Sequence, residues 1–309
     1  MKKSAFTFFI FVFLTFSPLY AEKVLIFTYS FNRPDFIEMQ YQTFKKFLQD
    51  DYEYIVFNDA VNESIHAQIE ATCAGLNIRC INIPQEIHSL PYLPRLPRDS
   101  FNHPSIRNCN VVQYSLNSLG LFHNGIVALF DSDLFLVKEF SITKFMQNHQ
   151  LAGLAQSRKR KNNTLINYIW IGLVFLDMSK LPNKQSINFN TGRIDDEPVD
   201  AGGYTYFYLQ NSPEVEVRYF SYAIAPLYMC KKCVQAHNDY CTHNTADLIA
   251  NGFDENQMKF ARSGPLNCEF FERATFVHYR AGTNWDNKAD NYHEVKTKLF
   301  NKYFQDILE

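Results

Sequence analysis

The chain has 309 residues, with 30 lysines and arginines against 32 aspartates and glutamates, so its formal net charge at pH 7 is -2. A balance so close to zero argues against a general nucleic-acid binder, which needs an excess of basic residues. The 29 phenylalanines and 18 tyrosines predict an aromatic core, and only a few of these rings can serve as stacking platforms for sugars or bases.

The first 21 residues have the features of a secretory signal peptide. Two lysines near the start precede an apolar stretch from Ala5 to Phe16, and Ala21 is the expected cleavage site. The stretch is shorter than the roughly 20 apolar residues of a spanning helix, but an uncleaved short membrane anchor remains the alternative. Residues 22–309 are therefore expected to form one exported domain, either periplasmic, secreted or lumenal, or held by that anchor.

Seven cysteines make disulfides plausible in an exported chain, and the odd number leaves at least one thiol free or paired between chains. The alternative is a zinc site at Cys230 and Cys233, with Cys241, His237 and His243 nearby. We expect one or two disulfides rather than zinc. The other cysteines are Cys73, Cys80, Cys109 and Cys268.

The first part of the domain alternates between predicted strands and helices. Apolar runs with β-branched residues indicate the strands, and apolar residues at helical spacing indicate the helices. This alternation predicts a parallel sheet of the Rossmann type. The predicted elements are strand 23–29, helix 34–48, strand 52–57, helix 62–74 and strand 77–83.

After a proline-rich surface segment at 85–103, helices and strands continue to the end of the chain without an internal repeat or a clear linker. The predicted fold is therefore a single α/β domain with a mostly parallel central sheet flanked by helices. The predicted helices are 104–121, 142–149 and 292–308; the strands are 126–130, 151–155, 166–176, 214–221 and 274–278; the loops are a basic one at 157–163 and an acidic, glycine-containing one at 195–203.

Asp131, Ser132 and Asp133 follow the predicted buried strand 126–130 and precede a second apolar run. The carboxyl ends of such strands are where open α/β sheets bind ligands. Carboxylate oxygens suit hard cations such as Mg2+ or Mn2+. The alternative is a turn with two capping aspartates.

In these residues and several others, the chain resembles the GT-A-type glycosyltransferases, which use nucleotide-diphospho-sugars. The resemblance covers most of residues 23–290. It is carried by Thr28 and Tyr29, Asn58 and Asp59, Arg107, the segment Leu129 to Asp133, and the late segment His278 to Trp285.

The resemblance implies a metal site and a donor site. Asp133 would bind Mn2+ or Mg2+ directly, Asp131 would contact the ribose or the metal through water, and His278 would be a third ligand. Ser132 would touch the donor, a UDP-sugar. Taken alone, without Asp133, His278 would more often be a core or interface histidine.

The late segment departs from the related families because no lysine stands just before Trp285. Arg280 or Lys288 would then have to meet the phosphate, with Gly282 and Asn284 alongside.

Four strand-end residues, Thr28, Tyr29, Asn58 and Asp59, are placed to meet the base and ribose, or else are ordinary turn residues. Arg107 could bind the diphosphate through two hydrogen bonds or pair with a surface acid. The run 158–161 could close over phosphates or form a solvated face, which is the commoner role of such a run.

Asp200 is the candidate for the catalytic base or for a contact to the donor sugar, because the resemblance implies that the region after residue 170 lines the acceptor and the sugar. Its rivals are Asp177, Asp195, Asp196 and Glu197. If the reaction inverts the sugar, one carboxylate should take the proton of the acceptor hydroxyl.

We therefore expect a metal-dependent glycosyltransferase that moves a sugar from a UDP-sugar to a protein, lipid or glycan acceptor. A metal-dependent phosphoesterase acting on nucleotide diphosphates and a secreted, non-catalytic binding module are the competing interpretations. Nucleotide-sugars are scarce outside the bacterial cytoplasm, so an exported enzyme would need a separate source of donor.

Overall fold

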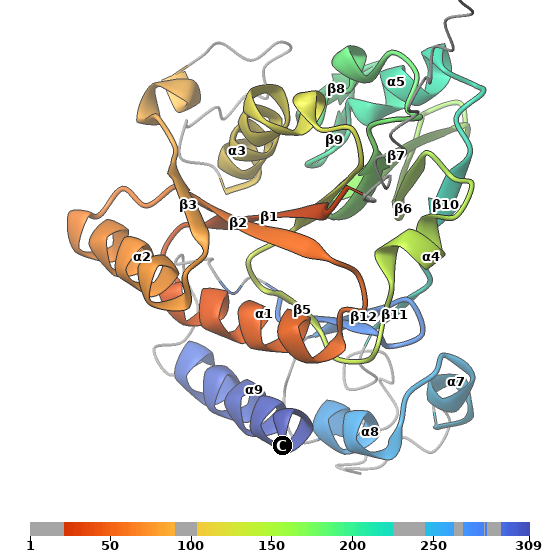
Figure 1. Cartoon of the computed structure of the whole chain (residues 1–309). Helices are drawn as coiled ribbons and strands as arrows, with labels where there is room; N and C mark the ends of the chain where they lie inside the picture. The colour runs from red at the N-terminus through yellow and green to blue at the C-terminus, as the bar shows by residue number, and fades with distance from the viewer. Residues whose placement is uncertain (1–21, 90–103, 225–244, 263–267, 281, 283–291) are drawn as a thin grey trace, which may run out of the picture.

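The computed structural model describes residues 22–89, 104–224, 245–262, 268–280, 282 and 292–309 (Figure 1). A seven-stranded central sheet has the order β10-β6-β7-β4-β1-β2-β3. β7 runs antiparallel to both of its neighbours, and every other neighbouring pair is parallel. The predicted α/β class with a mostly parallel sheet is thus confirmed. The strands are β1 Val24–Ser30, β2 Tyr52–Asn58, β3 Arg79–Asn82, β4 Ile126–Phe130, β6 Leu151–Lys159, β7 Leu165–Asp177 and β10 Val217–Tyr219.

Helices cover both faces of the central sheet because alternate residues of its inner strands are apolar on each side. Phe27 of β1 packs in one core cluster with Val112 of α3, whereas Ile26 packs in another with Phe44 of α1 and Ile69 of α2. Figure 1 shows α3 on one side of the sheet and α1 on the other. These helices are α1 Pro34–Phe47, α2 Glu63–Leu76 and α3 Pro104–Ser118.

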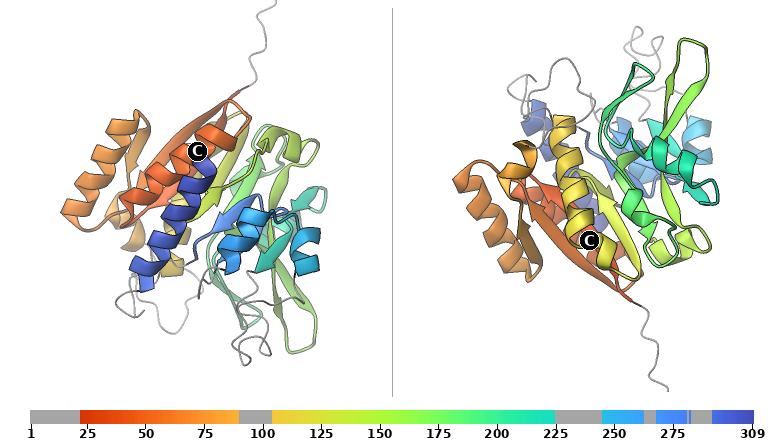
Figure 2. Two further views of the ribbon diagram at one scale, coloured as in Figure 1. Left: turned by 90° about the horizontal axis from the view of Figure 1, so that it is seen from below. Right: turned by 90° about the horizontal axis from the view of Figure 1, so that it is seen from above.

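A second, antiparallel sheet lies beside α1 and has the order β11-β12-β13-β5 (Figures 1 and 2). Its outer side is covered by α8 and α9, whose apolar residues Phe260, Phe300 and Phe304 pack with Phe135 of β5 and Phe270 of β12. The sequence did not predict this sheet as a unit. Its elements are β5 Leu134–Leu136, β11 Tyr222–Ile224, β12 Glu269–Phe271 and β13 Phe276–His278, and the helices near it are α7 Thr245–Ala250, α8 Glu255–Arg262 and α9 Tyr292–Leu308.

Two predicted loops are wrong in part. β6 continues through Ser157 to Lys159, because these exposed residues pair with the end of β7. The acidic segment contains a hairpin of β8 Gly192–Ile194 and β9 Glu197–Val199. Its turn residues Asp195 and Asp196 have φ values of 49° and 65°, a left-handed conformation that aspartate tolerates in tight hairpins.

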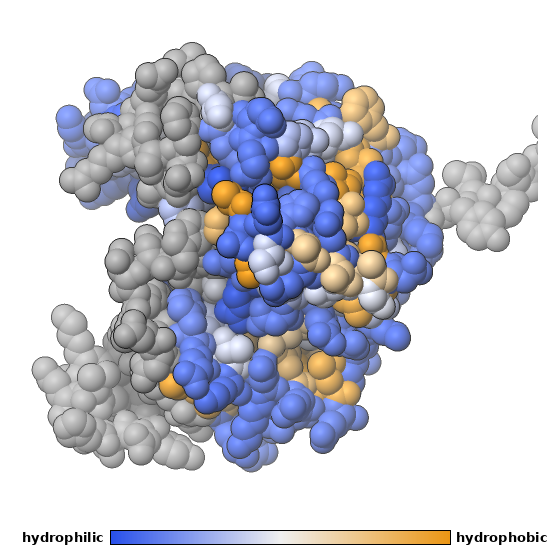
Figure 3. Space-filling view, turned by 90° about the vertical axis from the view of Figure 1, so that its left-hand side faces the viewer, coloured by the Kyte–Doolittle hydropathy of each residue, from blue (hydrophilic) through white to orange (hydrophobic). Residues whose placement is uncertain are grey.

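The remaining elements are short connections: the 3-10 helices η1 Gln85–Ser89, η2 Gly120–Phe122 and η3 Lys184–Ser186, and the helices α4 Ile142–Met146 and α5 Thr205–Asn211. Hydrophilic residues dominate the side of the molecule seen in Figure 3, with small groups of hydrophobic residues between them.

The four cysteines in the described part of the chain, Cys73, Cys80, Cys109 and Cys268, are free thiols, so none of them forms an expected disulfide there. Cys230, Cys233 and Cys241 lie outside the described residues, as do the predicted signal peptide and its cleavage site. Within the described ranges, no helix has both the length and the apolar character to cross a bilayer.

Candidate functional site

The segment Asp131 to Asp133 links the two sheets. β4 ends at Phe130 in the centre of the large sheet, and β5 begins at Leu134 in the small one. The amide of Asp131 still donates to the Gly172 carbonyl of β7 at 2.9 Å, and the Leu134 amide closes a turn on the Asp131 carbonyl at 3.1 Å. The two aspartates therefore sit at the carboxyl end of β4, where the sequence placed them.

A buried glutamine of α1 fixes this turn. The Gln40 side-chain amide donates to the carbonyl oxygens of Asp131 at 2.8 Å and of Leu134 at 2.7 Å. The Tyr54 hydroxyl donates to the Gln40 oxygen at 2.7 Å. Because Gln40 is 0% exposed, these bonds are shielded from water, and the turn is held in one conformation.

Strand pairing brings His278 to the same place from 145 residues further along the chain. β13 runs antiparallel to β5 with His278 opposite Leu134, and the Tyr279 amide donates to the Asp133 carbonyl at 2.8 Å. His278 Nε2 then lies 3.1 Å from Asp133 Oδ1. Ligand atoms of Asp131, Asp133 and His278 lie within 4.8 Å of one another, which is close enough for one metal ion.

The electrostatics of this group are those of two carboxylates held close together. Burial, and then the Asp133 carboxylate, raise the pKa of Asp131 to about 6. Burial alone would raise the pKa of Asp133, but the charge and hydrogen bond of His278 and the Gly282 amide hold it below its ordinary value. Burial alone would lower the pKa of His278, but Asp133 and then Glu269 raise it to about 10.

The three residues fit a divalent cation. Two carboxylates and one imidazole form a donor set that Mn2+ or Mg2+ accepts, and a cation there would relieve the repulsion that raises the pKa of Asp131. Asp131 Oδ1 also accepts from the Asn108 side chain at 3.0 Å, which orients that carboxylate.

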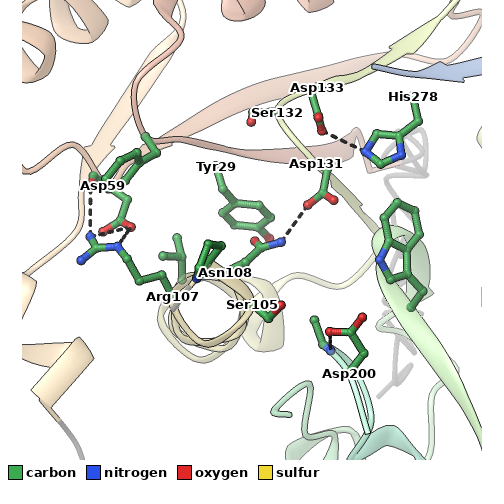
Figure 4. Close-up of a pocket in the computed structure, with 15 residues that line it drawn as sticks. Tyr29, Asp59, Ser105, Arg107, Asn108, Asp131, Ser132, Asp133, Asp200 and His278 are labelled. Carbon is green, nitrogen blue, oxygen red and sulfur yellow. Dashed lines mark hydrogen bonds and ion pairs between the residues drawn. The ribbon is translucent and has the colours of Figure 1, made fainter. Parts of the chain in front are cut away.

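Asp131, Asp133 and His278 are called the metal group below, as the candidate ligands of an ion. They open onto a cavity of about 270 Å³ at the carboxyl ends of β1 and β4 (Figure 4). These two strands are neighbours at the point where the strand order reverses, which is where open α/β sheets bind ligands. Figure 4 shows Asp131, Asp133 and His278 on one side of the cavity, Asp59 and Arg107 on another, and Asp200 below. The lining residues are Tyr29, Phe31, Asp59, Pro104, Ser105, Arg107, Asn108, Val111, Asp131, Ser132, Asp133, Trp170, Asp200, Ala201 and His278.

Arg107 lines the cavity but pairs with Asp59. Its Nε donates to Asp59 Oδ2 at 3.1 Å, and its terminal nitrogen reaches the Asp59 carbonyl at 3.1 Å and Gln85 at 3.0 Å. His88 Nε2 lies 2.8 Å from Asp59 Oδ1. Of the two predicted roles for Arg107, the ion pair is therefore present, although it is buried rather than on the surface.

Not every predicted donor residue lines the cavity. Tyr29 does, and its hydroxyl is hydrogen-bonded to Ser115 at 3.0 Å. Thr28 and Asn58 are buried and lie outside this lining, and the Asn58 side chain instead accepts from the Ala60 amide at 3.1 Å. Gly282 lies beside Asp133, and its amide donates to Asp133 Oδ2 at 2.8 Å. Asn284, Trp285 and Lys288 lie outside the described residues.

Asp200 follows β9 and reaches the cavity from the side opposite the metal group. The Ala201 amide donates to Asp200 Oδ1 at 2.8 Å, and the Asp200 amide donates to the Tyr168 hydroxyl at 3.4 Å. The next turn needs Gly202, because its φ is +88° and a Cβ there would lie 1.9 Å from the Ile169 carbonyl oxygen.

A second cavity, of about 320 Å³, adjoins the first and shares Ser105 and Asp200 with it. Its other walls come from the end of β6 and from the β8–β9 hairpin. They consist of Arg158, Lys159, Thr191, Glu197, Pro198 and Val199. Asp200 thus lies at the boundary between the two spaces.

Three residues that hold the candidate ligands in place were not predicted from the sequence: Gln40, Asn108 and Glu269. Asn108 and Gln40 are single polar residues on helices, with nothing in their spacing that distinguishes them from surface residues. Glu269 offers a signal, because it is a lone carboxylate in the apolar run Cys268–Phe271, nine residues before His278.

No protein-family model and no curated protein sequence matches this chain. Among solved structures it is similar to the galactosyltransferase LgtC, solved with donor and acceptor sugar analogues, at 12% identity and a TM-score of 0.42, over 92% of this chain and 95% of that one. It is also similar to the glycosyltransferase GlyE of Streptococcus pneumoniae, at 12% identity and a TM-score of 0.41, over 93% of this chain and 62% of that one. A third match is a mannosyltransferase of Pyrobaculum calidifontis, solved with GDP-Man and Mn2+, at 11% identity and a TM-score of 0.39, over 65% and 55%.

Proposed function

We propose that this chain is a divalent-metal-dependent glycosyltransferase that moves a sugar from a nucleoside-diphosphate sugar, a UDP-sugar in the first instance, to a hydroxyl of an acceptor. The observation that carries the proposal is the convergence of Asp131, Asp133 and His278 at the edge of a polar cavity, with Asp200 on the facing wall. A hard divalent cation held by these three side chains would still accept phosphate oxygens of the donor.

The two ends of the cavity would bind different parts of the donor, the diphosphate at one end and the nucleoside at the other. Asp131, Asp133 and His278 would hold Mn2+ or Mg2+, which neutralises the charge that develops on the departing diphosphate. Tyr29 and the Asp59–Arg107 pair form the wall toward β1 and β2, where the nucleoside would lie. The buried hydrogen bonds of Gln40 and Arg107 hold both walls in place, so that the cavity would position the donor without first having to rearrange.

Asp200 is proposed as the base. Its place between the two cavities puts it where a donor sugar on one side would meet an acceptor on the other. In a reaction that inverts the sugar, its carboxylate would take the proton of the acceptor hydroxyl as the new glycosidic bond forms. The cavity bounded by Arg158, Glu197 and Val199 is the proposed acceptor space.

The test is a panel of UDP-sugars incubated with the purified protein in the presence of Mn2+, Mg2+ or a chelator. We expect release of UDP with one donor, only when the metal is present, and none from Asp133→Asn. Asp306→Asn, which changes an exposed carboxylate of α9, is the matched control and should release UDP as the natural chain does.

Two results would contradict the proposal. Release of UMP and a sugar phosphate would instead identify a phosphoesterase. Mn2+-independent binding of UDP without any turnover would identify a binding module. We also propose that residues 22–309 act outside the cytoplasm, as the amino-terminal sequence predicts, so that the donor must be supplied in that compartment.

A further inference from the structure

The imidazole of His278 is hydrogen-bonded on both nitrogens. Nε2 lies 3.1 Å from Asp133 Oδ1, and Nδ1 lies 2.7 Å from Glu269 Oε2. Glu269 of β12 stands directly opposite His278 in the antiparallel pair of β12 and β13, so backbone register fixes the second contact. At 2.7 Å it is the shorter of the two.

Glu269 is itself held in place. The Tyr222 hydroxyl donates to Glu269 Oε1 at 3.0 Å, and the Arg280 guanidinium lies 3.7 Å from the same oxygen. The Glu269 side chain is only 14% exposed. Its two oxygens are thus occupied by Tyr222 and Arg280 on one side and by His278 on the other, which fixes the orientation of the carboxylate.

A carboxylate can only accept a hydrogen bond, so the nitrogen that faces Glu269 must carry a proton. Asp133 faces Nε2 in the same way while no ion is bound, so both nitrogens then carry protons. Once Nε2 gives up its proton to bind a metal, the remaining proton is on Nδ1 and the lone pair of Nε2 can face the ion. Nε2 is the nitrogen that faces Asp133 and the metal group. The choice of tautomer therefore follows from the side of the ring on which Glu269 lies.

We propose that Glu269 is a positioning residue for the metal centre: it holds His278 in the Nδ1-protonated tautomer and aims Nε2 at the ion shared with Asp131 and Asp133. The proposal rests on the metal-dependent function proposed above. Carboxylates that accept from the outer nitrogen of a metal-binding histidine orient the ring and make it a better ligand.

Glu269 does not act as a fourth ligand in this arrangement, because it meets the opposite edge of the imidazole from Nε2. Two aromatic rings limit rotation of the imidazole. Trp170 lies 5.3 Å and Phe271 lies 6.1 Å from it, measured between ring centroids. These contacts restrain the ring plane, while Glu269 keeps the proton on Nδ1 when Nε2 binds the ion.

The experiment compares Glu269→Ala and Glu269→Gln with the natural chain. Mn2+ affinity is measured by the loss of the free-ion electron paramagnetic resonance signal, and melting temperature is measured without metal. We expect Glu269→Ala to weaken Mn2+ binding by roughly 10- to 100-fold. Glu269→Gln should recover most of that affinity, because its amide oxygen still accepts from Nδ1.

Glu272→Gln is the matched control, because Glu272 follows the same strand and accepts from the Ser221 amide at 3.2 Å without touching His278. Its Mn2+ affinity should equal that of the natural chain. A purely structural role for Glu269 would lower the melting temperature of both Glu269 variants and leave Mn2+ affinity unchanged, which would overturn the proposal.

A second measurement needs no metal. In protein labelled with 15N-histidine, the resonance of the His278 Nδ1 proton should lie far downfield in the natural chain and move upfield in Glu269→Gln. A spectrum that shows unprotonated Nδ1 would also overturn the proposal. If the natural chain binds no Mn2+ at all, the proposed metal-dependent function fails, and the spectrum still shows whether Glu269 holds a proton on Nδ1.

Discussion

Gly282→Ala tests the packing around the metal group without removing any ligand or hydrogen bond. The Gly282 amide donates to Asp133 Oδ2 at 2.8 Å, and alanine keeps that amide. A Cβ at this position would lie 2.8 Å from Asp133 Cβ, 3.0 Å from Asp133 Oδ2 and 2.5 Å from Phe36 Cε2. The new methyl group must therefore displace either the carboxylate or the phenylalanine.

Phe36 is poorly able to move. It is 0% exposed and packs edge-on against Phe135, with ring centroids 5.4 Å apart. Overpacking at such a site costs about 1–3 kcal/mol in the free energy of unfolding. For a domain of this size each kcal/mol lowers the melting temperature by about 2–4 °C. Because Asp133 is the remaining group that can yield, we also expect Mn2+ affinity to fall by about tenfold or more.

The assay measures melting temperature and Mn2+ affinity on the same preparations. Gly75→Ala is the matched control, because Gly75 lies in the last turns of α2 and no atom lies within 4 Å of the position that its new methyl group would take. Alanine there should stabilise the fold by about 0.5–1 kcal/mol and leave Mn2+ affinity unchanged. If Gly282→Ala melts and binds Mn2+ as the natural chain does, residue 282 is not packed against Asp133 and the described geometry is wrong.

Three further results are expected. The pKa of His278 is raised to about 10, so Nε2 must lose a proton before it can bind a metal. Mn2+ affinity should therefore rise about tenfold per pH unit from pH 6 to 8. An Mn2+ affinity that does not change with pH would exclude His278 as a ligand. Arg107→Ala leaves Asp59 buried without its cation and should lower the free energy of unfolding in urea by about 3–5 kcal/mol, whereas exposed Arg79→Ala should change it by less than about 1 kcal/mol. Asp200→Asn should reduce sugar transfer by at least about 100-fold while Mn2+ affinity stays within about twofold; equal losses of both would place Asp200 in metal binding instead.

The sequence predicted the elements whose pattern is local. α1, α2 and β1 to β3 were found because apolar spacing marks each of them, and α9 was found at its observed bounds. The end of β6 was missed because Ser157 to Lys159 are polar and exposed, and they form a strand only by pairing with β7. The small sheet was missed as a unit for the same reason. Its strand β13 lies within the predicted strand 274–278, but the sequence of a three-residue strand does not show which partners it pairs with.

The residues of the site likewise differ in whether the sequence indicates them. Asp131 and Asp133 were predictable from the strand before them, and His278 from a resemblance. Gln40 was not predictable, since a polar residue on an amphipathic helix is ordinarily a surface residue. Here it is buried because the carbonyls of Asp131 and Leu134, freed where the chain leaves the sheet, need a donor.

That need explains why the metal group lies where it does. The chain leaves the central sheet after β4 and enters the small sheet at β5, so the three residues between them belong to neither sheet. Their backbone groups are satisfied by Gln40, by Gly172 and by the Tyr279 amide. Tyr279 directly follows His278, the last residue of β13, so the bond from its amide also brings the imidazole to this turn. The two aspartates thus lie where the chain passes from one sheet to the other. The pairing of β13 with β5, which holds this passage in place, also brings the imidazole of His278 beside them.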